Sequence, residues 1–590
     1  MVASTLRIAS EEYQSWICYK RHIASNSHLV EEGKQMSIVT TNRRSFLGGA
    51  LASVAAFSIR GKAASVAESA GVARALPSAS QIAWQDMEVG MFVHFAPNTW
   101  QDKEGDDLST PLDSINPDVD TDNWAQCAVN LGARYIVFVA KHQGGFCMWQ
   151  TETTKYSIGH TPWKAGRGDV LGDLAASCLK RGLRLGVYLS PRDDYFGAGL
   201  GGVCKDPAQQ AAYNAMYREQ LTEVLTRYGQ MVEVWFDGSS VVPTSDLVRK
   251  YAVHAAIFQG PDANIRWVGN ENGFAPYPLW NAESKADAQS GTSTSMHGDA
   301  NGDAWIPVES DVSIRRPNWF WSTKNERNLM TLDQLVEVYY RSVGRGSQLL
   351  LNIPADRRGH MPDADFARAR EFGAEIQRRF GKSVAETSGA GAQLELRLAK
   401  SGLVDHVILQ EDSHFGQRVR SFRLEGLVGK EWKTLYAGTS IGHKRIVPFA
   451  AHNFEALRLV VTETQGEPRI LRFAAFNTGA EVPATWDAAT QVWAADAVGQ
   501  WDGANFEVDL TKKITDATQY RLRFVAESGH VTAIAEVKML LDGAPAPHLV
   551  RPDPAVSDAL ILTMTGIGQK VVVSGTITDA KRGTILMQRL

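Results

Sequence analysis

Between residues 81 and 380, short apolar runs alternate with amphipathic, helix-like segments, and this alternation constrains the fold more than any other feature. The runs are rich in Val, Ile, Tyr and Phe, which is typical of strands buried on both faces of a parallel sheet. They lie at Met91–Phe95, Tyr135–Ala140, Leu183–Ser190, Met231–Phe236, Ile265–Gly269 and Gln348–Ile353. The helix-like segments are Thr121–Leu131, Val170–Arg181, Pro207–Tyr228 and Leu332–Val343. Repeated strand–helix units of this total length predict an α/β fold with a (β/α)8-like barrel, although fewer than eight strands stand out.

After about Ala385, the helical periodicity fades and strand-like alternation with frequent turn residues replaces it. A second block of this kind begins near Thr485 and continues to the end. Both blocks have the pattern of an all-β sandwich. We therefore expect four parts: an extension with an export signal at 1–76, the barrel at 77–384, and two β-sandwich domains at 385–482 and 483–590.

Charge and cysteine content narrow the classes of partner. The net charge is −4 and no dense Lys/Arg stripe occurs, so nucleic acid is not expected as a partner. The five cysteines form no Cys-x-x-Cys pair and no Cys/His ligand spacing, which argues against a zinc site. We expect buried free thiols at Cys127, Cys147 and Cys178. No cofactor is predicted, and the oligomeric state is not constrained.

Residues 42–47 read NRRSFL and are followed by a mildly apolar stretch at 48–59 and an Ala-rich stretch at 63–67. This order resembles a twin-arginine export signal, and the alternative is an amphipathic helix with a chance Arg pair. The apolar stretch is too short to cross a bilayer about 30 Å thick. We therefore expect a periplasmic or secreted protein, exported by the twin-arginine route, with no membrane span in its mature form.

Polar residues cluster where the predicted strands end. The carboxyl ends of barrel strands form the active-site face, and residues 233–238 (EVWFDG) are a buried strand that ends in Asp237. Asp237 could point at a substrate or could cap the next helix. Further polar groups follow other strands at His94, Asn98, Lys141, His142, Gln143, Ser190, Arg192, Asp193, Asn270 and Glu271. A purely structural barrel does not need so many, so a binding site is expected. A metal held by His94 and His142 is the less favoured alternative.

Several of these segments, taken in order, resemble family 29 α-L-fucosidases. The segments are 90–100 (GMFVHFAPNTW), 141–146 (KHQGGF), 186–191 (GVYLSP), 235–238 (WFDG), 266–271 (RWVGNE) and 350–354 (LLNIP). Residues 440–446 (SIGHKRI) also resemble the β-domain that follows the barrel in that family. The resemblance spans roughly residues 81–358 and implies hydrolysis of terminal α-L-fucose from an oligosaccharide or glycoconjugate, with retention of configuration.

The resemblance also implies the roles of two carboxyl groups. Asp237 corresponds to the family's nucleophile, which forms a fucosyl-enzyme ester. Glu271 corresponds to the acid/base of one subgroup, and we expect its pKa to be raised so that it holds a proton near neutrality. Glu283 and Glu309 are the other acid/base candidates.

The remaining implied contacts surround the sugar. Fucose contacts are implied for His94, Lys141, His142 and Tyr188. Trp235 could pack under the methyl group at C5, where burial of a CH₃ contributes up to about 1 kcal/mol. Residues 305–321 resemble a subgroup that prefers α-1,3- and α-1,4-linked fucose, and there Glu309 and Trp319 would line the aglycone side.

Two departures from the family pattern keep other functions open. Gln143 replaces an imidazole, and Arg192 replaces a stacking Trp. They leave room for a non-catalytic carbohydrate-binding protein with a degenerate barrel. They also leave room for a retaining glycosidase that acts on another deoxy-sugar.

Overall fold

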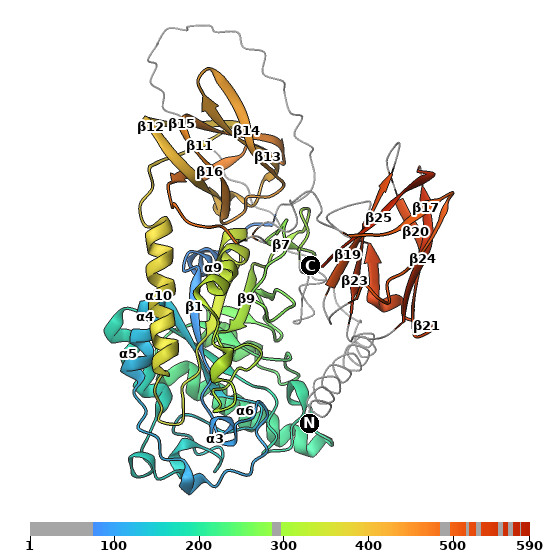
Figure 1. Cartoon of the computed structure of the whole chain (residues 1–590). Coiled ribbons are helices and arrows are strands. Elements are labelled where there is room, and N and C mark those ends of the chain that lie inside the picture. Colours follow the sequence, from blue (N-terminus) through green and yellow to red (C-terminus); the bar gives the residue numbers. More distant parts are fainter. Residues whose placement is uncertain are drawn as a thin grey trace, which may run out of the picture. The chain divides into compact units, whose positions relative to one another are not determined.

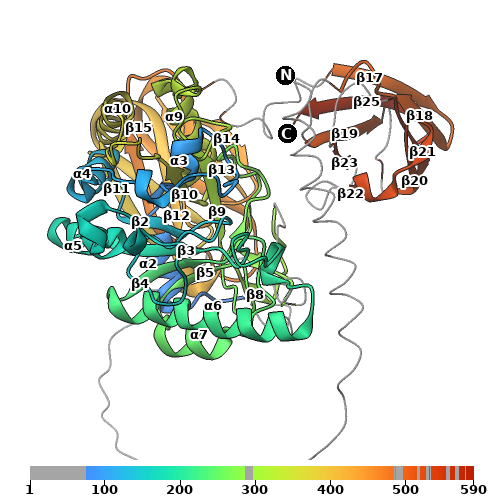
Figure 2. The same ribbon diagram turned by 90° about the horizontal axis from the view of Figure 1, so that it is seen from below.

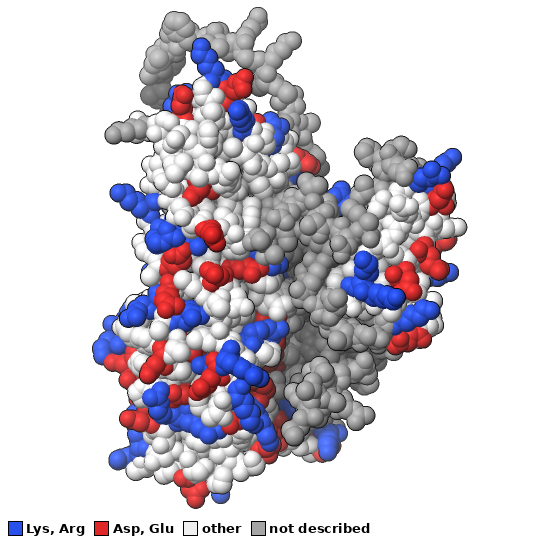
Figure 3. Space-filling model, in the orientation of Figure 1, with Lys and Arg blue, Asp and Glu red and all other residues white. Residues whose placement is uncertain are grey.

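The computed structural model describes residues 75–285, 297–483, 486 and most of 496–589, with gaps at 515–518, 527–530, 532, 553–558, 565–569 and 579 (Figure 1). The predicted twin-arginine signal lies outside the described residues. Among those residues, no helix is long and apolar enough to span a membrane. Acidic and basic side chains are interspersed over the face of the barrel seen in Figure 3.

Eight parallel strands form the sheet of the first domain. Their order is β5-β4-β3-β2-β1-β10-β9-β6, and every neighbouring pair is parallel. The strands are β1 Val89–Val93, β2 Tyr135–Lys141, β3 Arg184–Leu189, β4 Met231–Trp235, β5 Ala256–Phe258, β6 Arg266–Trp267, β9 Val308–Ser313 and β10 Gln348–Asn352. A parallel bridge between Phe258 and Ile265 connects the two edges, so the sheet closes nearly into a barrel. The predicted barrel is therefore confirmed.

Helices pack around the outside of the strands (Figure 2). They are α4 Thr121–Leu131, α5 Val170–Arg181, α6 Pro207–Arg227, α7 Ser245–Tyr251, α9 Leu332–Arg341 and α10 Asp363–Phe380. The ends of α4 and α5 match the prediction because both are set locally. Asp120 and Asp169 accept hydrogen bonds from the first turns, and Gly132 and Gly182 end the helices in the left-handed conformation that glycine favours.

The two faces of the barrel strands bury different side chains. One face packs against the helices and forms the main apolar core, in which Cys127, Cys147 and Cys178 are buried free thiols, as predicted. The other face fills the barrel interior with large aromatic residues, including Phe92, Tyr188 and Trp235. The interior is therefore a packed core.

Antiparallel sheets follow the barrel, as predicted. Six strands, β11 Ala385–Ala390, β12 Gln393–Glu411, β13 Val419–Val428, β14 Glu431–Gly438, β15 Arg445–Thr464 and β16 Arg469–Phe476, form one hydrogen-bonded sheet. The Tyr277 hydroxyl on the barrel side donates to the Ser440 carbonyl over 3.0 Å, and Gln417 bonds to both Asn281 and Leu279. These buried bonds connect the sheet to the barrel.

The C-terminal part contains two more antiparallel sheets with a shared apolar core. Their strands are β17 Asp496–Asp502, β18 Asn505–Asp509, β19 Gln519–Ala526, β20 Ala533–Leu541, β21 Ala544–Pro545, β22 Val550–Pro552, β23 Ala559–Thr563, β24 Val571–Thr578 and β25 Arg582–Arg589. Sheet order is β17-β25-β19-β23-β22 in one and β18-β24-β20-β21 in the other. Such a pair of facing sheets is a β-sandwich.

Candidate active site

Asp237 follows β4 at the carboxyl end of the barrel and is half-buried there. One of its two carboxylate oxygens is anchored. The Tyr188 hydroxyl donates to Oδ2 over 2.8 Å, and Gln143 Nε2 donates to the same oxygen over 3.5 Å. Among the described residues, no side chain donates a hydrogen bond to the other oxygen, Oδ1.

The pKa of Asp237 reflects two opposing effects. Burial raises the pKa above its ordinary value, because a charge is costly to remove from water. The hydrogen bonds from Tyr188 and Gln143, the Gly238 amide and the positive charge of Arg192 act in the opposite direction. Burial is the larger effect, so the pKa of Asp237 stays above its ordinary value.

The two departures from the family pattern lie together behind Asp237. Arg192 Nη1 donates to Gln143 Oε1 over 3.2 Å, so the same amide contacts both the guanidinium and the Asp237 carboxylate. Arg192 is itself held by Asp194 through two hydrogen bonds of 2.8 and 3.1 Å. An Arg–Gln pair thus stands where the resemblance implies a Trp and an imidazole.

The imidazole rings of His94 and His142 are both neutral and both lie beside Tyr188. The His94 Nδ1–H donates to Asn352 Oδ1 over 2.8 Å, and burial lowers the pKa of His94 to about 3. Burial also lowers the pKa of His142 well below its ordinary value, and its ring stacks on Tyr188 with centroids 5.7 Å apart. His142 Nδ1 is buried without a hydrogen-bond partner in the described structure, and a ligand hydroxyl could satisfy it.

Two tryptophans lie near these imidazoles, Trp235 in the barrel interior and Trp319 nearer the surface. Trp235 stacks on Phe258 with the ring centroids 3.5 Å apart, and its Nε1 donates to Glu233 in the barrel interior. Trp319 is half-exposed beside His94, with the ring centroids 5.3 Å apart. Its carbonyl accepts a hydrogen bond from Asn352, the residue that also orients His94.

Lys141 lies apart from these side chains. Its Nζ is completely buried and donates to Asp193 and Gln220 over 3.1 and 2.9 Å, against helix α6. The register of β2 shifts between Val139 and Lys141, and Lys141 therefore faces the helices instead of the barrel interior. The expectation of a direct contact between Lys141 and substrate is corrected accordingly.

Glu309 is also placed elsewhere than expected. It lies on β9 with no exposed surface, where burial and the nearby charge of Glu233 raise its pKa well above the ordinary value. Glu309 is thus a barrel-interior residue, not one that lines the aglycone side. Glu283, another acid/base candidate, lies on β7 (Ala282–Glu283), where its charge acts on Arg266.

Glu271 lies in the loop after β6, with 42% of its side chain exposed. Its Oε2 accepts a hydrogen bond from Arg316 Nη1 over 2.7 Å. Of the three acid/base candidates, it is the one at the open end of the barrel. Its charge and that of Asp237 both raise the pKa of Asp311.

Two carboxyl groups, those of Asp311 and Glu104, lie near these side chains but are not among the predicted site residues. Asp311 on β9 is almost completely buried and accepts a hydrogen bond from Trp267 Nε1 over 2.5 Å. Glu104 accepts from the Trp319 amide over 2.9 Å, and burial raises its pKa. Alternation along β9 could have identified Asp311, because it lies two residues after Glu309 and so faces the same side.

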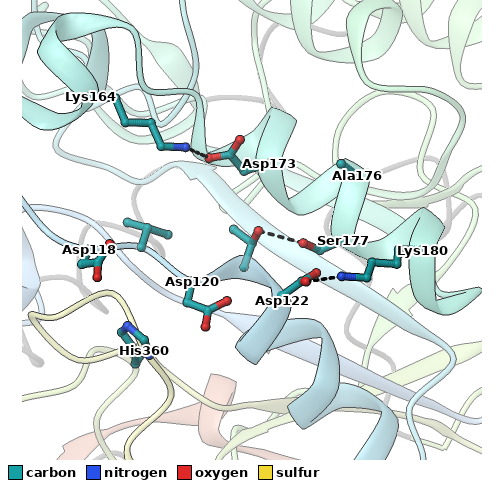
Figure 4. A pocket seen from close by; sticks show the side chains of 11 residues that line it. Asp118, Asp120, Asp122, Lys164, Asp173, Ala176, Ser177, Lys180 and His360 are labelled. Atoms are coloured by element: carbon teal, nitrogen blue, oxygen red, sulfur yellow. Dashed lines mark hydrogen bonds and ion pairs between the residues drawn. The ribbon is translucent and has the colours of Figure 1, made fainter.

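Another hollow lies outside the barrel mouth. A cavity of about 510 Å³ opens between α4 and α5 (Figure 4). Among the charged side chains that line it, Lys180 pairs with Asp122 and Lys164 pairs with Asp173, while Asp120 caps α4. Within the described residues, no group of three or more His, Cys, Asp or Glu side chains could hold a metal ion. The chemistry is therefore assigned to the barrel mouth.

A parallel barrel whose mouth holds several carboxyl groups and neutral imidazoles is the arrangement of a glycoside hydrolase. The α-L-fucosidase family model matches residues 113–379. Alpha-L-fucosidase 1 of Arabidopsis thaliana is 32% identical over 449 residues, which cover 67% of this chain and 86% of that protein.

Solved structures agree with this match. A glycoside hydrolase 29 family member from an unknown rumen bacterium is 26% identical, with a TM-score of 0.63, and covers 88% of this chain and 100% of its own. A Ruminococcus gnavus fucosidase of the same family, crystallised with fucose, is 25% identical, with a TM-score of 0.62, and covers 69% and 96%. The chain belongs to glycoside hydrolase family 29 and is an α-L-fucosidase.

Replacing Arg192 with Met should move the acidic limb of the kcat/KM profile to higher pH. Arg192 lowers the pKa of Asp237, so its removal raises that pKa, and Asp237 becomes protonated at a higher pH as the solution is acidified. The profile is measured with an aryl α-L-fucoside. Arg167→Met, at an exposed position, is the matched control. An unchanged acidic limb in Arg192→Met would show that the guanidinium does not act on Asp237.

Proposed function

We propose that this α-L-fucosidase retains configuration through a fucosyl-enzyme ester on Asp237, with Glu271 as the acid/base. The observation that supports the proposal most strongly is that Tyr188 and Gln143 both donate to Oδ2 of Asp237. Anchoring of one oxygen fixes the direction of the carboxylate. It also leaves Oδ1 as the atom that attacks.

In the first step, Asp237 Oδ1 forms a bond to C1 of fucose while the bond from C1 to the glycosidic oxygen breaks. The proton of Glu271 moves to that oxygen, and the aglycone leaves as an alcohol. In the second step, Glu271 takes a proton from water, the water oxygen bonds to C1, and the ester bond to Asp237 breaks. Two inversions give net retention, and both carboxyl groups return to their initial states.

The imidazoles and the floor support this chemistry by binding the sugar. His94 and His142 are neutral, so neither repels the positive charge that develops at C1. His94 donates from Nδ1 to Asn352, so its Nε2 can accept a hydrogen bond from a hydroxyl group, and His142 can donate one and accept another. Tyr188 and Trp235 provide apolar surface beside them. The Ruminococcus gnavus relative, which was crystallised with fucose, shows that a fold of this kind accommodates the sugar.

Asp237→Ala should lower turnover of an aryl α-L-fucoside on the order of 10⁴-fold, because the residue that bonds to C1 is lost. Added azide should restore turnover by attacking C1 from the vacated side, and the product should be the β-fucosyl azide. Asp246→Ala, at an exposed Asp paired with Arg218, is the control and should keep full activity. Asp237→Ala with near-normal turnover would reject the mechanism. A wild-type protein that binds fucosylated glycans without turnover would favour the carbohydrate-binding alternative.

We further propose a preference for α-1,3- and α-1,4-linked fucose, based on the resemblance of residues 305–321 to that subgroup and on the rim position of Trp319. A panel of α-1,2-, α-1,3- and α-1,4-fucosylated trisaccharides tests it by the rate of fucose release. Rapid cleavage of the α-1,3 and α-1,4 members and slow cleavage of the α-1,2 member is expected. Cleavage restricted to the α-1,2 member would contradict the assignment.

We also propose export by the twin-arginine route to the periplasm or beyond, because residues 42–47 carry the paired arginines. Changing Arg43 and Arg44 together to Lys should leave the enzyme in the cytoplasmic fraction, since the motif depends on arginine itself. Arg60→Lys is the control and should not alter fractionation. Export that is unaffected by the double change would contradict this route.

A further inference from the structure

Asp311 is a buried acidic residue that the mechanism above does not use. It lies on β9, where Ser310 bonds to Ser347 and Val312 packs in the core between strands and helices. Because side chains alternate along a strand, Asp311 faces the barrel interior. Its register partner on β10 is Leu350, which belongs to the interior aromatic core.

One side chain holds this carboxyl in place. Trp267 Nε1, on the adjacent strand β6, donates to Asp311 Oδ1 over 2.5 Å. Among the described residues, no Lys or Arg forms an ion pair with Asp311. Oδ1 is thus directed toward Trp267, and the backbone amide of Asp311 also stabilises the carboxyl group. Among the described residues, no side chain donates a hydrogen bond to the remaining oxygen, Oδ2.

The groups that face Asp311 are predominantly acidic. Glu271 from the loop after β6 and Asp237 from the end of β4 both raise its pKa, while the Trp267 hydrogen bond lowers it. Glu309 on the same strand is a further acidic neighbour. Burial has the largest effect, and together these influences raise the pKa of Asp311 to about 8.

We propose that Asp311 is a sugar-binding residue, whose carboxyl group donates a hydrogen bond from Oδ2 to a hydroxyl of the fucose that Asp237 attacks. This inference rests on the proposed function. A neutral carboxyl group has an O–H donor, whereas a carboxylate can only accept. Asp311 lies within the electrostatic reach of both the nucleophile and the acid/base. Trp267, by occupying Oδ1, favours the orientation in which Oδ2 carries the proton.

The proposal makes the alkaline limb of the kcat/KM profile a property of Asp311. With 4-nitrophenyl α-L-fucoside, whose leaving group needs little protonation, kcat/KM should decline as the pH rises through about 8. Asp311→Asn should keep most of the neutral activity, because the amide still donates, and should remove this decline. Asp311→Ala should raise KM about tenfold, the effect of one lost hydrogen bond.

Trp267→Phe provides a matched test of the same group. The Trp267 hydrogen bond lowers the pKa of Asp311, so its removal should raise that pKa and move the alkaline limb to higher pH. Asp311→Asn and Trp267→Phe therefore change the limb in different ways. A purely structural role would lower activity by the same factor at every pH.

Binding of free L-fucose, measured by titration calorimetry at pH 7 and pH 9, separates Asp311 from Glu271, because free fucose has no leaving group to protonate. Wild-type affinity should fall at pH 9, and that of Asp311→Asn should not. Equal pH dependence in the two proteins, or an unchanged alkaline limb in Asp311→Asn, overturns the inference. An inactive wild-type enzyme would instead reject the proposed function.

Discussion

The hydrogen bond from the Tyr188 hydroxyl to Asp237 Oδ2 is the interaction on which the site depends. Asp237 lies beside the apolar, aromatic side chains of the barrel interior, and burial raises the pKa of its carboxyl group. Tyr188 and Gln143 offset this effect, and Arg192 adds a positive charge behind them. The donors that lower the pKa of Asp237 also fix the direction of its carboxyl group, so electrostatics and orientation have one structural origin.

The position of Trp235 depends on contacts within the barrel interior more than on the loops. Trp235 stacks on Phe258, and Glu233 accepts hydrogen bonds from the Trp235 indole and from Trp84 on helix α2 (Ala79–Gln85). The second interior carboxyl is Glu309, whose pKa is raised by burial and by the charge of Glu233. Glu233 thus orients two of the indole rings in the barrel interior.

Helices and strands whose ends are fixed by residues close in sequence could be predicted from the sequence. Helices α4 and α5 begin after a capping Asp and end at a glycine. Asp237 could be recognised because it follows a buried run and precedes a glycine. Strand β5 contains only three residues, too few for a period to emerge, whereas the two residues of β6 lie inside the predicted run Ile265–Gly269. Lys141 faces the helices because of a register shift in β2, and Glu309 lies one layer below Asp311. Such displacements depend on strand pairing, which a single sequence does not specify.

The central claim is that Asp237 forms a covalent bond to the sugar. Incubation with a 2-deoxy-2-fluoro-α-L-fucosyl donor bearing a good leaving group should slow the second step and accumulate the ester. Mass spectrometry of a peptic digest should then locate one fluorofucosyl group on the peptide that contains Asp237. Labelling of Glu271 or Asp311, or complete turnover of the donor with no labelled peptide, would contradict the account.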